Sequence, residues 1–143
     1  MTYDIHGVWD ANITSLGAFT RAHTNITEIT LALELLWRNN IEPAKVVLGL
    51  GFYGRSFTLK DPSCKGVNCP FSGGGKPGPC TNTTGILSAV EIRDVVKKGA
   101  SVSLDAQAGA KIVTWDNDQW VSYDDRQTLK LKTDYANQHC LGG

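Results

Sequence analysis

The sequence carries no excess of positive or negative charge, because 14 Lys and Arg residues balance 14 Asp and Glu residues. A protein that binds nucleic acid needs a basic cluster to neutralise phosphates, and this sequence has none, which excludes a nucleic-acid partner. It also lacks a stretch of the about 20 apolar residues that a membrane-spanning helix requires. With 41% hydrophobic residues, the composition predicts an ordinary globular domain without a membrane partner.

The amino terminus lacks the basic segment and following apolar segment that mark a secretory signal. The interior nevertheless has features typical of exported proteins, because three sequons place candidate glycosylation sites at Asn12, Asn25 and Asn82. At 143 residues, the chain is also shorter than the ~250 residues of a typical complete (β/α)8 barrel. We therefore expect a fragment of a secreted parent protein, and the location of this chain itself stays open.

Cysteine is scarce, with four residues in the chain. Cys64, Cys69 and Cys80 lie in one loop-rich stretch and are disulfide candidates, whereas Cys140 is distant. Four cysteines allow three pairings, and we expect one bridge within residues 64–80. A zinc site is not expected, because the second half of a zinc knuckle is absent and the three histidines share no ligand spacing. The sequence indicates no metal and no cofactor.

A helix is predicted over residues 26–37, where apolar side chains recur at helical spacing. Asn25 is the expected N-cap, with Glu28 bonding back to it. Leu31 and Leu35 widen the apolar stripe, which predicts that the helix is buried on more than one side.

Further elements follow along the chain. Ser88 and Glu91 predict the start of a second helix, which Gly99 ends. Residues 111–115 and 119–123 are predicted to form a hairpin, followed by a last helix that is capped by Asp124 or Asp125. Residues 60–85 are rich in Pro, Gly and Ser and are predicted to form a surface loop stapled by the disulfide.

Two segments are predicted to be strands that flank the first helix, residues 1–4 and residues 45–55. The continuous apolar run at 46–48 is typical of a parallel strand covered on both faces, so the three elements form a βαβ unit. Gly49, Gly51 and Gly54 match no phosphate-binding fingerprint, and close backbone packing explains them better.

The chemistry is concentrated near the amino terminus, in Tyr3, Asp4 and Trp9. Residues at the carboxyl end of a strand are where α/β folds place their functional groups. An indole stacks on the apolar face of a sugar, while a phenol and a carboxylate bond its hydroxyl or acetamido groups. The alternative is that the aromatic residues pack at the rim of a core and Asp4 stabilises a turn.

Three stretches together carry a resemblance to a known family. These are Met1-Thr2-Tyr3-Asp4, the run from Leu48 to Phe57 that contains Gly-Phe-Tyr-Gly-Arg, and Gln119-Trp120-Val121-Ser122-Tyr123-Asp124-Asp125. In this order and spacing, the chain resembles the carboxyl-terminal third of the catalytic domain of glycoside hydrolase family 18 chitinases, of the fungal class V type. The resemblance implies an α/β fold: a partial (β/α)8 TIM-barrel slice, from strand 6 to helix 7, with an inserted α+β domain.

The resemblance also implies a division of the chain and a set of roles. Residues 1–57 would be a barrel segment (strand 6, helix 6 and strand 7), residues 58–121 the chitinase insertion domain, and residues 122–143 barrel helix 7. The partner would be chitin or a chito-oligosaccharide, cleaved with retention by the substrate's own acetamido group. The substrate-binding residues would be Met1, Tyr3, Asp4, Trp9 and Arg55, with Tyr3 and Asp4 as auxiliary catalytic residues.

The sequence also departs from the family. The Asp-x-Asp-x-Glu segment, whose Glu protonates the glycosidic oxygen, occurs nowhere in the chain. We therefore predict a chain that binds substrate but does not hydrolyse it alone. The alternatives are a fragment of a non-catalytic chitin-binding lectin, or an independent module that shares these segments. Oligomeric state, endo or exo action, and the activity of the parent stay open.

Overall fold

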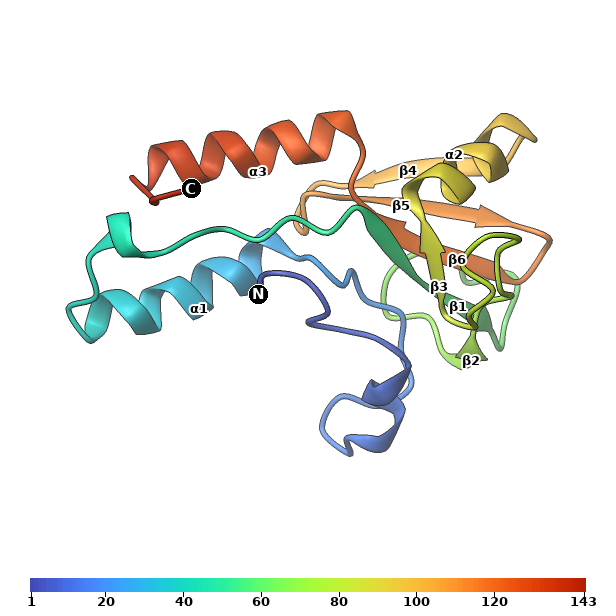
Figure 1. Cartoon of the computed structure of the whole chain (residues 1–143). Helices are drawn as coiled ribbons and strands as arrows, with labels where there is room; N and C mark the ends of the chain where they lie inside the picture. The colour runs from blue at the N-terminus through green and yellow to red at the C-terminus, as the bar shows by residue number, and fades with distance from the viewer.

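The computed structural model describes all residues, 1–143, as a six-stranded antiparallel sheet at one end and two long helices at the other (Figure 1). The strand order is β2-β1-β6-β5-β4, with β3 paired to the other part of β1. The elements are η1 (Val8–Asn12), α1 (Ile26–Arg38), η2 (Pro43–Lys45), β1 (Tyr53–Leu59), β2 (Phe71–Gly74), β3 (Ile86–Ser88), α2 (Ala89–Lys97), β4 (Ser101–Asp105), β5 (Ala110–Trp115), β6 (Gln119–Tyr123) and α3 (Arg126–Gln138).

The predicted hairpin is confirmed as β5 and β6, which pair from Lys111 opposite Tyr123 to Trp115 opposite Gln119. Asp116 and Asn117 have positive φ angles of 45° and 67°, a conformation that Asp and Asn tolerate better than most residues. One face of the sheet carries a core cluster that includes Phe57, Phe71 and Trp120. Leu87, Ile92, Val113 and Val121 form another cluster beneath α2.

Of the two segments predicted to be strands, residues 1–4 form no strand, and residues 45–55 form one only at their end, where β1 begins at Tyr53. Residues 1–4 and 46–52 lie outside any helix or strand, and no parallel strand pair forms between these two segments. A β-strand forms only where a neighbouring strand hydrogen-bonds to its backbone N–H and C=O groups. Residues 46–48 have only two such bonds to the carboxyl terminus, Leu48 N–H to Gly143 O and Gly142 N–H to Val46 O. The strand that does form begins later, at Tyr53, and is antiparallel.

The first helix starts where it was predicted, but its cap differs. The Asn25 side chain accepts a hydrogen bond from Thr27 N–H, whereas the Glu28 carboxylate does not return to Asn25. It bonds His6 Nε2 instead, at 2.9 Å. This bond gives the buried His6 ring a hydrogen-bonding partner that water cannot supply.

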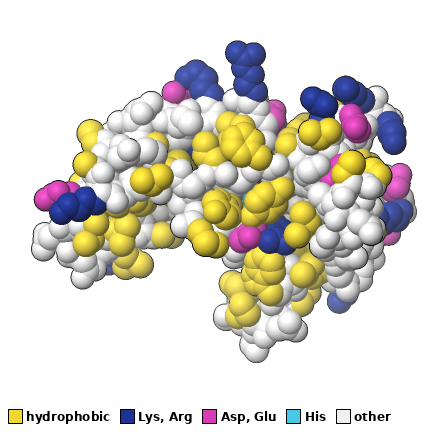
Figure 2. All heavy atoms as spheres, in the orientation of Figure 1, with side chains coloured by type: hydrophobic (Ala, Val, Ile, Leu, Met, Phe, Trp, Pro, Cys, Tyr) yellow, Lys and Arg dark blue, Asp and Glu magenta, His cyan; other side chains and the backbone are white.

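The prediction that α1 is buried on more than one side is wrong. Ile29 and Leu33 are buried against Leu48 and Ala136, but Leu31 and Leu35 keep more than half of their surface exposed. The hydrophobic side chains over this end of the molecule are visible in Figure 2. Since α3 and the coil before β1 cover only one side of α1, Leu31 and Leu35 on its other side remain exposed.

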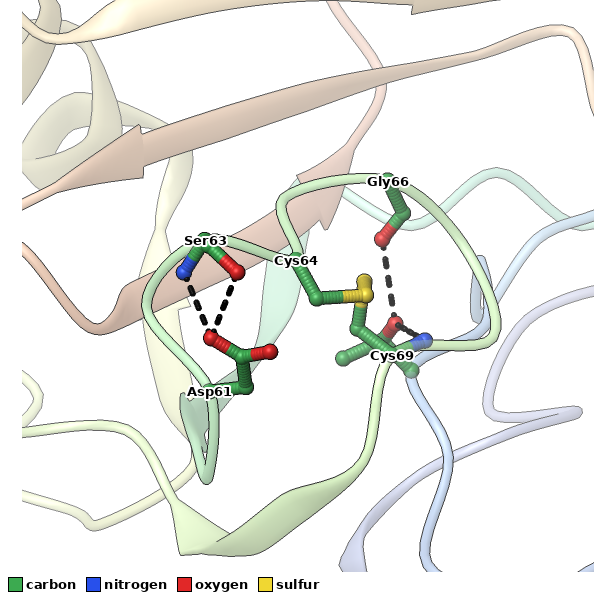
Figure 3. The surroundings of a disulfide bond; sticks show 6 residues. Asp61, Ser63, Cys64, Gly66 and Cys69 are labelled. Atoms are coloured by element: carbon green, nitrogen blue, oxygen red, sulfur yellow. Dashed lines mark hydrogen bonds between the residues drawn. A yellow bond between two sulfur atoms is a disulfide. The ribbon is translucent and has the colours of Figure 1, made fainter.

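Residues 60–85 are more ordered than a surface loop. One disulfide forms within the predicted range, between Cys64 and Cys69 (Figure 3). Cys80 stays free and exposed, so this candidate is not bridged. Residues 71–74 form β2 despite their glycines, because β1 supplies their hydrogen-bonding partner.

The other two caps form largely as predicted. Ser88 and Glu91 make a reciprocal capping box at α2, and Gly99 follows its end with a φ of 97°. Asp125 caps α3, whereas Asp124 turns inward and forms a buried ion pair with Lys132. None of these helices is both long and apolar enough to cross a bilayer.

Candidate functional site

The carboxylate of Asp4 is the centre of a cluster drawn from separate parts of the chain. Arg55 donates two hydrogen bonds to this carboxylate, from Nε to Oδ1 and from Nη2 to Oδ2, each 2.8 Å long. Tyr53 donates its hydroxyl to Oδ1 at 2.5 Å. Because side chains two residues apart on a strand point to the same face, β1 delivers Tyr53 and Arg55 together. Asp4 itself adopts a φ of 59°, a turn conformation that Asp tolerates.

The electrostatics of the cluster favour a fixed ion pair. Burial acts to raise the pKa of Asp4, but the bonds from Arg55 and Tyr53 outweigh it and hold that pKa below its ordinary value. The bond to Asp4 raises the pKa of Arg55 against the effect of burial. Burial, and then Asp4, raises the pKa of the Tyr53 hydroxyl, so it stays a donor. Asp4 is therefore ionised and Arg55 charged across the physiological range.

Trp9 lies over this ion pair. The Arg55 guanidinium carbon is 4.8 Å from the centre of the Trp9 ring and 5.5 Å from that of Tyr53, within the range of a cation–π contact. A Cβ on Gly7 would lie 2.3 Å from the Trp9 ring, so only glycine permits this placement. The indole, the guanidinium and the phenol thus form one continuous surface.

The segment that carries Trp9 is anchored by a buried histidine that the sequence analysis did not single out. His6 lies between Asp10, at 2.7 Å, and Glu28 of α1, at 2.9 Å. Arg21 lies 3.8 Å from Asp10. Because a carboxylate lies within hydrogen-bonding distance of each ring nitrogen, this network ties η1 to α1 and fixes the position of Trp9.

Tyr3 joins the cluster at its edge. Its ring meets Tyr53 in an edge-to-face contact, with centroids 6.2 Å apart. A Cβ on Gly49 would lie 2.8 Å from the Tyr3 ring, which supports close packing as the role of this glycine. Met1, with 89% of its surface exposed, is outside these contacts.

Two residues of the cluster were missed by the sequence analysis. Tyr53 has a signal that was available, because it lies two positions before Arg55 in a strand. His23, fully buried beside Asp4 and Tyr53, has none, because it lies in a segment without periodicity. The structure therefore brings Tyr3, Asp4, Trp9 and Arg55 together, and adds these two.

The remaining predicted residues lie elsewhere. Glu91 accepts hydrogen bonds from the Cys80 and Thr81 backbones as well as from Ser88. Burial acts to raise its pKa, and these bonds reverse the effect and lower it to about 2, which fits a structural role. No group of three potential ligands is arranged around a metal site. Asn12 and Asn82 are exposed, whereas Asn25 is partly buried.

The cluster is an open surface rather than a closed pocket. The Asp4 and Arg55 side chains are 25% and 16% exposed, and neither lines the cavity of about 210 Å³ between Arg21, Glu28 and Asp105. Figure 2 shows hydrophobic side chains surrounding acidic and basic atoms near the middle of this face. Aromatic faces beside fixed hydrogen-bonding groups are suited to a ligand with apolar faces and polar edges, such as a sugar.

Comparison with known proteins places this chain in a family. The sequence matches glycosyl hydrolases family 18 over residues 1–143. It is 32% identical to a secreted chitinase of Penicillium expansum, covering 100% of this chain and 10% of that protein.

Two solved structures show the same fold. A plant class V chitinase mutant from Cycas revoluta in complex with (GlcNAc)3 has a TM-score of 0.84 and 32% identity, over 100% of this chain and 38% of that one. Human YKL-39, described as a pseudo-chitinase with retained chitooligosaccharide binding properties, has a TM-score of 0.89 and 28% identity, over 100% and 40%. The chain thus spans two fifths or less of each of these relatives. It belongs to glycosyl hydrolases family 18 and has the α/β fold of its chitinases, antiparallel sheet included.

Proposed function

We propose that this chain supplies part of the sugar-binding cleft of a secreted chitinase that hydrolyses β-1,4-linked N-acetylglucosamine polymers. One observation carries the proposal: Asp4, Arg55, Tyr53 and Trp9 meet in one partly exposed cluster in a chain that belongs to family 18. The ligand (GlcNAc)3 in the Cycas revoluta structure supports the class of substrate.

The proposed mechanism is retaining and assisted by the substrate. The acetamido oxygen of the sugar attacks its own anomeric carbon while the glycosidic bond breaks, and water then opens the cyclic intermediate. Tyr3 and Asp4 orient the acetamido group, Trp9 stacks on a neighbouring sugar, and Met1 and Arg55 line the cleft. An internal nucleophile held near its target avoids the entropy of a bimolecular encounter, worth up to about 7–11 kcal/mol in well-oriented systems.

The proposal includes an architecture. Residues 1–57 and 122–143 form a slice of a (β/α)8 barrel, from strand 6 to helix 7, and residues 58–121 form an inserted α+β domain. The antiparallel sheet is compatible with such an insertion, because it begins with β1 and returns through β6 directly to α3. In a complete barrel, neighbouring strands would supply hydrogen-bonding partners for residues 1–4 and 46–52.

The sequence contains no Asp-x-Asp-x-Glu segment, so we propose that this polypeptide alone binds chito-oligosaccharide without cleaving it. Protonation of a leaving group contributes typically 10²–10⁴-fold to the rate. No carboxylate in the cluster is available for that task, because Asp4 is ionised and bonded to Arg55 and Tyr53.

A titration followed by NMR tests the binding surface. Adding chitotetraose to the labelled chain is expected to shift the Trp9 indole N–H and the Arg55 Nε–H signals, while the indole signal of the buried Trp120 stays in place. Cellotetraose, which lacks acetamido groups, serves as the control and is expected to bind more weakly. Equal shifts with both sugars, or no shift with chitotetraose, would contradict the proposal.

A second candidate function is that of a non-catalytic chitin-binding protein. It is favoured by the likeness to human YKL-39, the pseudo-chitinase with retained chitooligosaccharide binding. Both candidates predict binding by this chain. The residue at the acid position of the parent protein separates them, because Glu there supports the enzyme and Gln or Leu supports the lectin.

A further inference from the structure

His23 is the most completely buried polar ring beside the cluster, with 0% of its surface exposed. Its Nε2 lies 3.1 Å from the backbone oxygen of Tyr53, and its Nδ1 lies 3.4 Å from the backbone nitrogen of Asp4. The ring also packs on the Tyr53 ring, with centroids 5.1 Å apart. His23 therefore contacts two members of the cluster without touching the open surface.

The two bonds fix the state of the ring. A carbonyl oxygen only accepts a hydrogen bond, so Nε2 carries the proton, and a backbone N–H only donates, so Nδ1 is bare. A second proton would set two N–H groups against each other beside Asp4. The hydrogen-bonding partners therefore select the neutral Nε2–H tautomer.

The charged groups around the ring agree with this state. Burial lowers the pKa of His23 to about 4, opposed by the negative charge of Asp4 and assisted by the positive charges of Lys132 and Arg55. The Asp4 carboxylate is 3.8 Å from Nδ1, but it is already neutralised by Arg55. Lys132 is paired with Asp124.

The backbone of His23 connects the same segments as its side chain. Its N–H donates to Ser122 Oγ of β6 at 3.2 Å, and its carbonyl oxygen accepts from Ile5 N–H at 3.0 Å. The residue thus joins the amino-terminal segment, β1 and β6. Gly51 leaves room for the ring, because a Cβ there would lie 3.3 Å from His23 Cε1.

We propose that His23 is a positioning residue of the sugar-binding site: its neutral ring holds the Asp4 backbone in its turn and sets Asp4 at the distance from β1 at which Arg55 and Tyr53 bind its carboxylate. The sugar-binding role of the site rests on the proposed function. An apolar residue of similar size would fill the space, but it would leave the Asp4 N–H without this acceptor.

NMR of the labelled full chain tests the ring directly, without any sugar. The proposal predicts imidazole ¹⁵N shifts of the Nε2–H tautomer and no titration of His23 above a pH of about 4 to 5. An Nδ1–H tautomer, or a midpoint near the ordinary pKa of 6.5, would overturn it. These outcomes do not depend on whether the chain binds chito-oligosaccharide.

Three variants test the consequence for binding. His23→Asn keeps an acceptor near the position of Nδ1, His23→Gln keeps a donor near the position of Nε2, and His23→Leu keeps neither. The matched control is His139→Leu, at the end of α3, where the ring stacks on Tyr135.

Each affinity for chitotetraose is measured at a temperature where every variant is fully folded by circular dichroism. We expect His23→Leu to weaken binding about tenfold, and His23→Asn and His23→Gln about threefold each, with the control unchanged, since one net hydrogen bond corresponds to several-fold in affinity. Equal affinity of His23→Leu and the unsubstituted chain would overturn the positioning role. Absence of binding by the unsubstituted chain would instead overturn the proposed function, and the ring would then be judged by its tautomer and titration alone.

Discussion

The Asp4 carboxylate is held by donors from β1, and its backbone N–H donates to His23 in the segment before α1, so its geometry is set by tertiary structure. The two bonds from Arg55 are parallel and charge-assisted, an arrangement that an ammonium group does not reproduce. The aromatic rings of Trp9 and Tyr53 hold the guanidinium in the same orientation. The shape of the guanidinium at position 55 therefore matters more than its positive charge alone.

Replacing Arg55 with Lys is expected to weaken chitotetraose binding about tenfold, because one bond to Asp4 and the stacking on Trp9 are lost. This corresponds to about 1.4 kcal/mol. Isothermal titration calorimetry measures the change. Arg38→Lys, at the exposed end of α1, is the matched control and is expected to bind as the unsubstituted chain does. An unchanged affinity of Arg55→Lys would show that the guanidinium does not organise the site.

The buried ring of His23 gives the stability a defined pH dependence. Its pKa is lowered from 6.5 to about 4 on folding, so the unfolded chain binds the proton more tightly. The stability contributed by the neutral ring is fully present above pH 6.5 and is lost as the pH falls towards 4, by roughly 3 kcal/mol in total.

Urea unfolding at several pH values between 4 and 7 measures this loss. In His23→Asn, the side chain at position 23 no longer titrates between pH 4 and 7. The slope of unfolding free energy against pH is therefore expected to flatten. An identical slope in both proteins would assign the loss to other residues.

Among the secondary-structure elements, α2 depends most on one side chain. The Glu91 carboxylate accepts bonds from both its cap, Ser88, and the preceding loop at Cys80 and Thr81. Glu91→Ala is expected to reduce the unfolding free energy by about 2 kcal/mol, because several buried donors lose their partner. Thermal unfolding measures this loss of stability, with Glu34→Ala on the exposed face of α1 as the control. Equal melting temperatures of the two variants would contradict this role.

The disulfide closes a short loop, since Cys64 and Cys69 are five positions apart. Loop-closure entropy for so few residues predicts a stabilisation of about 2 kcal/mol. Replacing both cysteines with Ala is expected to lower the unfolding free energy by at least this amount, since Cys69 is also buried in the core. Cys80→Ala is expected to have little effect, because that thiol is free and exposed. A comparable loss from Cys80→Ala would indicate a different pairing in solution.

Elements with a local signal were predictable from the sequence. Caps at Ser88 and Asp125 and the hairpin around Asp116 are specified by residues close together in the chain. The strand β2 was missed because its glycines suggest a loop and only its pairing with β1 makes it a strand. Residues 46–52 were wrongly predicted to be part of a strand for the opposite reason, since an apolar run needs neighbours before it becomes a strand.

At the scale of the whole chain, only part of the candidate site could be predicted from the sequence. Tyr3, Asp4 and Trp9 were named from their chemistry and Arg55 from a resemblance to family 18, and the structure brings them together. Their roles towards a sugar remain predictions. His23 was not predictable, because its importance comes from contacts with Asp4, 19 positions away, and Tyr53, 30 positions away.

The combination of a sugar-binding cluster with no proton donor is best tested by product analysis. The purified chain is incubated with chitotetraose, binding is measured by calorimetry, and products are identified by mass spectrometry over several days. We predict measurable binding, abolished in a double variant Asp4→Ala and Arg55→Ala, and intact chitotetraose throughout. Release of chitobiose by the chain alone, or binding that survives in the double variant, would contradict this.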